Sequence, residues 1–491
     1  MNQNIGAIFA IFTPDKLLRV WQIALILFAI SGVWATDNVK LESIKSNSIQ
    51  TDFYDSSTKN SKSPPHLPYA DSPLFSYSKN DKNIVVIVLD MFSGSHTPYI
   101  LEQFPQFMKQ LDGFTLFPNA LSTTNATAHS ITTLIGGEYY AIYNMNKRKN
   151  NLAQEIRQGY ENTGIAFANS GFSVSYMTQT YSNLIDNPKI HLVSDYKIFE
   201  PYFYERHNLK NAIESYREQT RHYESLDLIS FGLFRFAPKY RAREKIYNNG
   251  DWLYDKMPNL LAHIAHASNT YAPTHIIRID SNKPTFKFFH TSMTHFPFAV
   301  YFNGKECEFG GKKSAWNDYP HEEKITDKQF FQHYDSEACA MQYLTEYINL
   351  LKNVGIYDNT QIFVVSDHGG DVSFGTPKFA YRPDVLFLFK DFGTRGNLKI
   401  DNRLMANYDI ASIFCANLVR GCPNVPPNIL QNYPPNNREI IYMMPYHWIL
   451  EKHKLNEWLI NKAYKVKDNI YDEKNWIDIS DESYGIVNVK K

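Results

Sequence analysis

Continuous runs of apolar residues recur along the middle of the chain and predict buried β-strands. Residues 83–89 read NIVVIVL, residues 361–366 read QIFVVS and residues 385–389 read VLFLF. Runs rich in β-branched and aromatic residues are typical of strands that are covered on both faces of a sheet. Residues 171–177 and 285–290 show shorter strand patterns. We therefore expect all five segments to form strands of a central sheet.

Apolar residues at helical spacing lie between these runs. One series extends from Ala340 to Leu351, with apolar residues three or four positions apart, and the helix it predicts ends near Gly355. Strands that alternate with helices predict an α/β fold with a mostly parallel central sheet flanked by helices.

The N-terminus carries a different pattern. Residues 20–35 form an uncharged apolar run that follows Lys16 and Arg19. A membrane-spanning helix needs about 20 apolar residues and the core of a signal peptide has about 7–15, so the run lies between the two. Small residues before Ala35 favour cleavage, whereas the apolar stretch 5–12 favours retention. Both alternatives export the rest of the chain, and we expect an uncleaved membrane anchor in residues 1–36.

Changes in the polar content of the chain predict the remaining domain boundaries. Residues 37–82 are rich in Ser, Asn, Asp and Lys and predict a polar linker, because such a segment buries too little apolar surface to offset its ordering entropy. We expect a catalytic domain in residues 83–450 and a C-terminal extension in residues 451–491, whose charged and aromatic composition favours a docked helix. An anchor followed by a linker suits an enzyme at the cell membrane with an extracytoplasmic, periplasmic catalytic domain.

Composition excludes several classes of protein. The 491 residues include 50 Lys and Arg and 50 Asp and Glu, so no net charge attracts the chain to nucleic acid. A hydrophobic content of 43% excludes a mainly disordered chain. The four cysteines, Cys307, Cys339, Cys415 and Cys422, form no CxxC pair, so thiolate metal binding is disfavoured. Their even number in an exported chain favours disulfides, with three pairings open.

Two of the predicted strands end in metal-binding residue types. Asp90 follows the run 83–89, and Asp367 with His368 follows the run 361–366. Ligands of open parallel sheets bind beyond the carboxyl ends of the strands. Two carboxylates and an imidazole that converge there suit a divalent ion such as Zn²⁺ or Mn²⁺. Asp90 taken alone is equally typical of a turn or a helix cap.

A hydroxyl-rich segment lies between these strands in the sequence. Residues 117–137 predict a loop and a short helix closed by Gly136 and Gly137. A hydroxyl at the start of that helix, Thr127, is placed for nucleophilic work, because the helix N-terminus favours anionic phosphate or sulfate. The alternative is that Thr127 or Asn125 only caps the helix.

Four segments together resemble the alkaline phosphatase superfamily, in its sulfatase-like branch with phosphoethanolamine transferases and lipoteichoic acid synthases. Residues 127–137 follow the spacing of the sulfatase segment C-x-P-S-R-x-x-L-x-x-G, with Thr127 at the nucleophile position. Residues 357–369 are similar to the signature N-T…S-D-H-G, residues 294–298 resemble the H-x-P-F segment, and residues 408–412 look like the later D-I-x-P-T helix. The resemblance extends over roughly residues 83–425.

The resemblance implies a role for each matching position. Asp90, Asp367 and His368 would hold the metal together with the hydroxyl of Thr127, which would attack phosphorus and form a phosphothreonine. His295 would bind the phosphoryl oxygens or protonate the leaving group, the alternative for this histidine being aromatic packing. Lys378 would contact the anion, although surface lysines are commonly only solvated.

Three departures from the family pattern modify this expectation. Threonine cannot be oxidised to the formylglycine aldehyde that sulfatases use, so Thr127 disfavours ordinary sulfatase chemistry. Ile131 stands where sulfatases have an arginine. The first strand ends in one Asp, and no histidine follows His368 within twenty residues, which favours one metal ion over two. His290 and His129 are spare candidates for which a structural role is the simpler interpretation.

These expectations combine into one functional hypothesis. We expect an extracytoplasmic metal-dependent transferase that moves phosphoethanolamine or phosphoglycerol from a phospholipid donor to an envelope glycan or lipid. A phosphate or sulfate ester hydrolase of the same fold is one alternative. A non-catalytic envelope-binding or regulatory protein is the other, motivated by the missing arginine and the missing second-metal histidine.

Overall fold

The structure is a computed structural model in which part of the chain is described. The described residues are 72–200, 203, 207, 209, 234, 247–248, 251–252, 260–298, 300–309, 328–434 and 438–480. The predicted anchor 1–36 and most of the predicted linker 37–82 lie outside them. Among the described helices, none combines the length and the apolar character needed to cross a membrane.

The chain divides into two compact units. The smaller consists of residues 1–67 and 208–260, and its described part includes a short hairpin of β7 (Tyr247–Asn248) and β8 (Asp251–Trp252). The larger consists of residues 68–207 and 261–491 and contains the site discussed below.

A mixed eight-stranded sheet forms the centre of the larger unit. Its strand order is β15-β3-β14-β13-β2-β10-β5-β6. In that order the strands are Lys399–Ile400, Phe114–Leu116, Phe387–Lys390, Thr360–Val365, Asn83–Leu89, Thr285–Thr291, Ser173–Met177 and Ile190–Val193. The five strands from β13 to β6 are parallel, whereas β14 runs antiparallel to both of its neighbours. The predicted strands are therefore confirmed, with β14 reversed within a mostly parallel arrangement.

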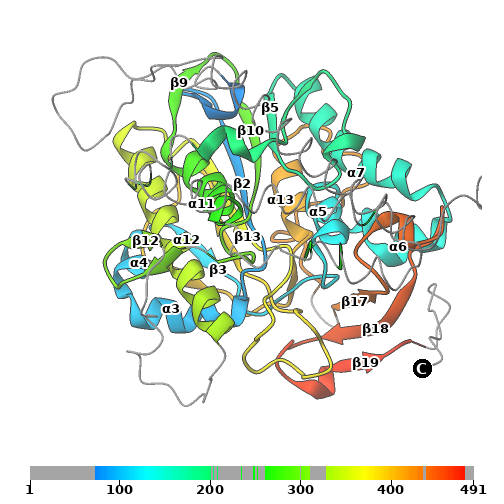
Figure 1. Ribbon diagram of the computed structural model, residues 1–491. Helices are drawn as coiled ribbons and strands as arrows, with labels where there is room; N and C mark the ends of the chain where they lie inside the picture. The colour runs from blue at the N-terminus through cyan, green and yellow to red at the C-terminus, as the bar shows by residue number, and fades with distance from the viewer. Residues whose placement is uncertain are drawn as a thin grey trace, which may run out of the picture. The chain divides into compact units, whose positions relative to one another are not determined.

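Helices cover both faces of this sheet. Figure 1 shows α11 (Leu260–His275) and α12 (Lys328–Asn353) on one side, and α5 (Thr127–Gly136), α7 (Leu152–Asn169) and α13 (Asp409–Cys415) on the other. The shorter helices are α3 (Thr97–Gln103), α4 (Pro105–Gln110) and α6 (Ile142–Arg148). The prediction of a helix through Ala340 to Leu351 is confirmed by α12.

The hydrophobic core explains why β2 carries no polar side chain between its ends. Ile84, Val86 and Val88 belong to a cluster of buried residues that also includes side chains of α5, α7 and α13. The alternate residues of β2, such as Val85 and Ile87, are buried as well, because helices pack on the opposite face. A strand covered on both faces reads as a continuous apolar run.

Smaller sheets surround this body. β17 (Glu439–Pro445), β18 (Ile460–Lys467) and β19 (Trp476–Asp478) form an antiparallel sheet. The expected docked helix after residue 450 is therefore wrong for the described part. Buried and exposed residues alternate along part of β18, which is typical of a strand and not of a helix. Tyr464 and Val466 are buried against Tyr442 and Trp476. The remaining pairs are β1 (Ser76–Ser78) with β9 (Arg278–Ser281), β4 (Ala120–Leu121) with β16 (Met405–Ala406), and β11 (Val300–Phe302) with β12 (Cys307–Phe309).

The four cysteines form two disulfides. Cys307 is bonded to Cys339, and Cys415 to Cys422. The first joins β12 to α12, and the second closes the turn that follows α13. The pairing that the sequence left open is thus the local one.

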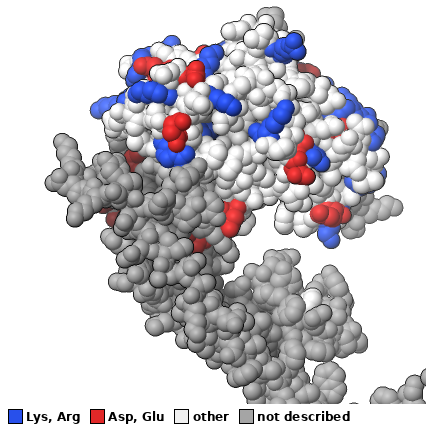
Figure 2. All heavy atoms as spheres, turned by 90° about the horizontal axis from the view of Figure 1, so that it is seen from above, with Lys and Arg blue, Asp and Glu red and all other residues white. Residues whose placement is uncertain are grey.

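Charged side chains of both signs are mixed on the surface. Figure 2 shows basic and acidic residues interspersed over the described part of one face, with uncharged residues between them. Arg395 illustrates the local pairing, because it bonds both Asp358 and Asp112. Exposed pairs of this kind each contribute at most about 1 kcal/mol.

Candidate active site

Strand register brings the predicted metal ligands to one edge of the sheet. Val365 of β13 pairs in parallel with Val88 of β2, so Asp367 and Asp90 leave neighbouring strands at the same level. The ligand atoms of Asp90, Asp367 and His368 all lie within 4.8 Å of one another, and all three residues are buried. The convergence predicted from the sequence is present in the fold.

Thr127 lies at the same place and is the most accessible member of the group. It is the first residue of α5, and the N-cap position before it is Ala126, so neither Thr127 nor Asn125 is the N-cap. Instead, Oγ1 donates to Asp90 Oδ1 at 3.3 Å and lies 3.1 Å from His368 Nε2. Thr127 is half-buried, whereas the other three residues are buried. The hydroxyl therefore faces the acid–imidazole group from the side that a substrate can approach. We call Asp90, Thr127, Asp367 and His368 the catalytic group.

The pairing of Asp367 indicates that a cation fits here. Its Oδ1 accepts a hydrogen bond from the backbone N–H of Met91 at 3.0 Å. Its Oδ2 is buried, lies 3.4 Å from His368 Nε2 and makes no hydrogen bond with any described residue. A buried carboxylate oxygen without a hydrogen bond is costly unless a ligand compensates it. Two carboxylates and an imidazole are donors that suit Zn²⁺ or Mn²⁺, so the residues fit a divalent ion.

The backbone around Asp367 is fixed by polar side chains that the sequence analysis did not identify. The carbonyl oxygen of Asp367 accepts hydrogen bonds from Ser122 Oγ at 2.7 Å, Ser130 Oγ at 2.6 Å and Asn407 Nδ2 at 2.7 Å. Ser130 belongs to α5, so the nucleophile helix and the Asp367 turn are held by one network. Asn407 directly precedes the motif 408–412, and this position was the sequence signal that could have identified it.

Electrostatics favour the charged form of Asp90. Burial alone would raise its pKa, but the charge of His295, the hydrogen bond and charge of His290, and the charge of His368 together hold the pKa below its usual range. His290 Nε2 lies 3.2 Å from Asp90 Oδ2. His290 therefore contacts the site directly and orients Asp90. His129, the other spare histidine, packs instead against Trp458, with the ring centroids 4.4 Å apart.

His295 and Lys378 have different positions. His295 influences the pKa of Asp90, and its Nδ1 donates to the backbone oxygen of Phe296 at 2.6 Å. That bond leaves Nε2 as the nitrogen available to a substrate. Lys378 is exposed, and among the described residues no hydrogen bond or ion pair joins it to the catalytic group. Its contact with an anion stays a prediction.

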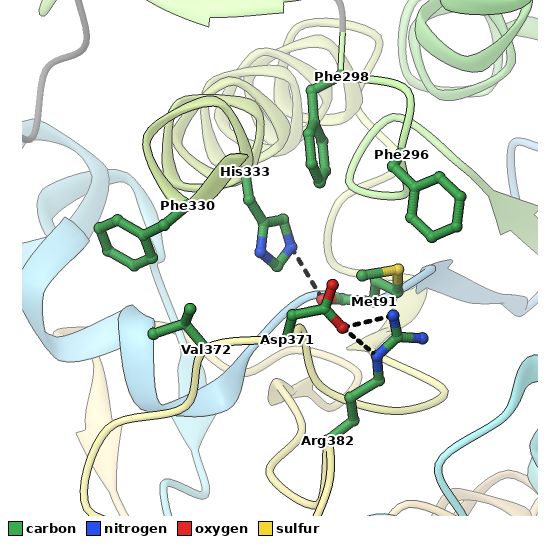
Figure 3. Close-up of a pocket in the computed structure, with 8 residues that line it drawn as sticks. All are labelled: Met91, Phe296, Phe298, Phe330, His333, Asp371, Val372 and Arg382. Carbon is green, nitrogen blue, oxygen red and sulfur yellow. Dashed lines mark hydrogen bonds and ion pairs between the residues drawn. The ribbon is translucent and has the colours of Figure 1, made fainter. Parts of the chain in front are cut away.

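A pocket opens beside Met91, the residue after Asp90. It has a volume of about 300 Å³ and aromatic walls. Figure 3 shows that Asp371 and Arg382 form an ion pair on one side while His333 points toward Met91. Arg382 Nε bonds Asp371 Oδ1 at 2.7 Å. No sequence pattern indicated Arg382, because its position depends on the loop that follows His368. The lining residues are Met91, Phe296, Phe298, Phe330, His333, Asp371, Val372 and Arg382.

A second group of acid and histidine side chains adjoins this pocket through His333, and its ligand atoms also lie within 4.8 Å of one another. Glu337 accepts a hydrogen bond from the backbone N–H of Ser93 at 2.7 Å and pairs with His96 Nδ1 at 2.6 Å. His333 Nε2 lies 3.2 Å from Glu337 and 3.0 Å from the backbone oxygen of Met91. We call His96, His333 and Glu337 the brace, because it joins α12 to the turn that carries Asp90.

The brace also holds the turn after His368. A side chain at Gly370 would collide with the ring of His333, since an added Cβ would lie 2.2 Å from its Cε1. The glycine therefore allows α12 to approach the segment that supplies two members of the catalytic group.

Comparison with known proteins gives one family. The family model described as Sulfatase matches residues 82–388. Among curated proteins, no sequence matches this chain.

Several solved structures are similar in fold. The lipoteichoic acid synthase LtaP from Listeria monocytogenes is 10% identical, with 81% of this chain and 84% of that chain covered and a TM-score of 0.37. The C-terminal periplasmic domain of EcEptC from Escherichia coli is 10% identical, with 82% and 94% covered and a TM-score of 0.39. The phosphonate monoester hydrolase of Agrobacterium radiobacter is 14% identical, with 81% and 88% covered and a TM-score of 0.40. These values are too low to transfer an activity or a substrate.

Proposed function

The chain belongs to the sulfatase family, and from this premise we propose that it is a metal-dependent transferase of phospho-substituents. The family match confirms the resemblance that the sequence motifs carry. The proposed reaction moves phosphoethanolamine or phosphoglycerol from a phospholipid to a glycan or lipid of the cell envelope, through a phosphothreonine on Thr127.

The position of the Thr127 hydroxyl is the observation that carries this proposal. Oγ1 lies within hydrogen-bond distance of both Asp90 and His368 at the start of α5. A nucleophilic hydroxyl needs an adjacent group that takes its proton or lowers its pKa. The N-terminus of α5 adds backbone N–H groups that favour a phosphoryl anion.

The chemistry of threonine favours phosphoryl transfer over sulfatase chemistry. A secondary alcohol can be oxidised only to a ketone, so Thr127 cannot become the aldehyde hydrate of sulfatases. A plain hydroxyl attacks phosphorus directly. The covalent intermediate divides one difficult displacement into two easier ones.

The first displacement consumes the phospholipid. Thr127 Oγ1 forms a bond to phosphorus while the bond from phosphorus to the diacylglycerol oxygen breaks. The hydroxyl proton of Thr127 passes to a neighbouring base. His295, whose Nδ1–H is held by the Phe296 carbonyl, donates a proton from Nε2 to the leaving diacylglycerol.

The second displacement transfers the group. A hydroxyl of the acceptor attacks phosphorus and the bond from phosphorus to Thr127 breaks. The base that took the threonine proton returns it to Oγ1, which restores the hydroxyl. His295 now takes the acceptor's proton. Which molecule occupies the acceptor position decides between transfer and hydrolysis.

A divalent ion completes this arrangement. Asp90, Asp367 and His368, with Thr127 Oγ1, are the residues that would hold one ion, Zn²⁺ or Mn²⁺. Such an ion supplies positive charge that stabilises phosphoryl oxygens and lowers the pKa of the attacking hydroxyl. Ile131 supplies no charge where sulfatases have an arginine, and Lys378 and Arg382 are the cations of the nearby loop.

The proposed location is the outer side of a cell membrane. The two disulfides support it, since disulfides persist in oxidising compartments. The uncharged run 20–35 and the polar segment 37–82 support a membrane-anchored chain.

The test uses the full chain with Zn²⁺ or Mn²⁺ and phospholipids labelled in the headgroup. We expect release of diacylglycerol, with the label passing to an added envelope glycan or lipid. Thr127→Ala should abolish the release, and Thr132→Val should not, because Thr132 is a buried hydroxyl of the same helix that makes no hydrogen bond with any described residue. Label released only into water would assign hydrolysis instead. Activity that survives in Thr127→Ala would overturn the covalent route, and activity that survives chelation would overturn the role of the metal ion. No turnover by metal-loaded wild type would support a binding role.

A further inference from the structure

One loop exposes more apolar surface than its surroundings. Residues 446–459 connect β17 to β18, and within them Tyr446 is 46% exposed, Trp448 66% and Leu455 76%. Single exposed apolar residues are ordinary on protein surfaces. Three large ones in a stretch of ten residues indicate a surface that meets something apolar.

The loop is held in a defined shape by backbone hydrogen bonds. The N–H of Tyr446 donates to the oxygen of Leu459 at 2.8 Å, which closes the base of the loop. His453 Nδ1 accepts from the N–H of Leu459 at 2.9 Å, and its Nε2 donates to the oxygen of His447 at 2.7 Å. His453 therefore bridges the two sides of the loop, so the exposed side chains project from a fixed scaffold.

The same loop packs directly on the nucleophile helix. His129 lies two residues after Thr127 in α5, and its ring centroid is 4.4 Å from that of Trp458 and 5.5 Å from that of His453. The inner side of the loop, formed by His453 and Trp458, thus packs against the helix that carries the proposed nucleophile.

Basic residues surround the apolar ones. Trp458 exchanges hydrogen bonds with Asn146 of α6, at 2.9 and 2.7 Å, which places the end of α6 beside the loop. Figure 1 shows α6 next to β17 and β18. Four exposed lysines lie on the two segments, Lys147, Lys149, Lys452 and Lys454, and outnumber the two acidic residues of the loop, Glu451 and Glu457. Lys149 and Lys454 both pair with Glu457, so the lysines exceed the acids by two positive charges.

We propose that residues 446–457, with the end of α6, dock on the surface of an anionic phospholipid bilayer. Trp and Tyr favour the boundary between headgroups and acyl chains, and lysines beside them attract anionic lipid. This inference rests on the proposed function, because a phospholipid donor must reach Thr127 from a bilayer. An anchor and a linker would limit only the distance between the catalytic domain and the membrane. A docked loop would also fix which face of the domain contacts the bilayer.

The charge pattern selects this occupant. Lysines around a Trp–Tyr–Leu group complement an anionic lipid surface, and a basic rim would repel the identical rim of a second copy.

The first experiment measures contact with lipid. The full chain is reconstituted into vesicles of phosphatidylglycerol and acyl-brominated phosphatidylcholine, and Trp fluorescence quenching is recorded. Because the chain has seven tryptophans, the signal of Trp448 is the difference between wild type and Trp448→Phe. We expect bromine to quench that difference signal. A difference signal that bromine does not quench would overturn the proposal, as would shielding of Trp448 in lipid-free, self-associated protein.

The second experiment measures whether docking of the loop increases turnover of a donor that is embedded in a bilayer. Donor turnover is compared for a vesicle phospholipid and a soluble short-chain phospholipid, with the double variant Trp448→Ser/Leu455→Ser. We expect turnover of the vesicle donor to fall about tenfold, with the soluble donor unchanged. Val419→Ser, which removes a fully exposed apolar side chain outside the loop, should change neither rate. Equal rates for the double variant and Val419→Ser on vesicles would overturn the proposal.

The two experiments separate this proposal from the proposed function. If wild type turns over neither donor, the proposed function fails, and quenching of Trp448 still decides whether the loop docks. If both donors turn over and Trp448 is not quenched, the proposed function is supported and the proposed docking of the loop is wrong.

Discussion

The catalytic group and the brace contain similar side chains at the same edge of the sheet, yet they differ in how their polar atoms are paired. In the brace, both oxygens of Glu337 have partners, and the buried atom that makes no hydrogen bond with any described residue is a nitrogen, His96 Nε2. In the catalytic group, Asp367 Oδ2 is buried without a hydrogen bond to any described residue, and Thr127 is accessible. The two groups therefore differ in which buried atom lacks a hydrogen bond: a carboxylate oxygen beside a half-buried hydroxyl in the catalytic group, and an imidazole nitrogen in the brace.

The largest expected effect comes from removing the nucleophile. Thr127→Ala should lower donor turnover about 10³-fold or more, because no hydroxyl remains to form the intermediate. Thr127→Ser should retain part of the activity. The measurement is the initial rate of diacylglycerol release, with Thr132→Val as the control. A Thr127→Ala rate within a few-fold of wild type would remove Thr127 from the reaction.

The second largest effect is expected on metal content, which should differ between variants of the catalytic group and of the brace. Asp367→Asn should weaken binding of Zn²⁺ or Mn²⁺ about 100-fold, since it removes a charged ligand oxygen. Glu337→Gln should leave the metal content unchanged. Elemental analysis after dialysis measures both variants. Equal metal loss in the two would mean that the brace also binds the ion.

The two substitutions should change the free energy of unfolding in opposite directions. In chelated protein, Glu337→Gln should lower the free energy of unfolding by about 3 kcal/mol, because it breaks a fully buried pair and leaves His96 without its counter-charge. Asp367→Asn should raise it by about 1 kcal/mol, because it removes a buried charge whose Oδ2 lacks a hydrogen bond. Denaturant unfolding with chelator present gives both values, and a common sign would contradict the distinction.

The smallest expected effect is on pH dependence. Burial opposes a charged His96, but the charge and hydrogen bond of Glu337 raise its pKa above the usual range. A raised folded-state pKa contributes stability below the unfolded pKa near 6.5, and this contribution is lost as pH rises through the folded value. The cost of Glu337→Gln should therefore be larger at pH 5.5 than at pH 9. A cost independent of pH would show that His96 is neutral in the fold.

The sequence alone predicted the parallel strands and the convergence of Asp90, Asp367 and His368, because both follow from local signals. The run 83–89 is apolar at every position after Asn83, Asp90 directly follows β2, and Asp367 lies two residues after the end of β13 at the same edge of the sheet. Thr127 could be placed by its spacing to Gly136 and Gly137, which close α5.

Other features depend on tertiary contacts and left no local pattern. The brace joins His96 to Glu337, residues 241 positions apart, and no spacing rule connects them. The reversed direction of β14 and the strands after residue 450 depend on pairing with distant segments. His290 has the sequence context of an ordinary strand residue, and only the strand register places it beside Asp90.

The most direct test of the central claim is mass spectrometry of the protein after brief exposure to phosphatidylethanolamine with metal and no acceptor, stopped in acid. The account predicts that the peptide containing Thr127 gains the mass of one phosphoethanolamine, and that the adduct disappears when acceptor is added. Diacylglycerol release during the same interval with Thr127 unmodified, or with the adduct on another residue, would contradict it.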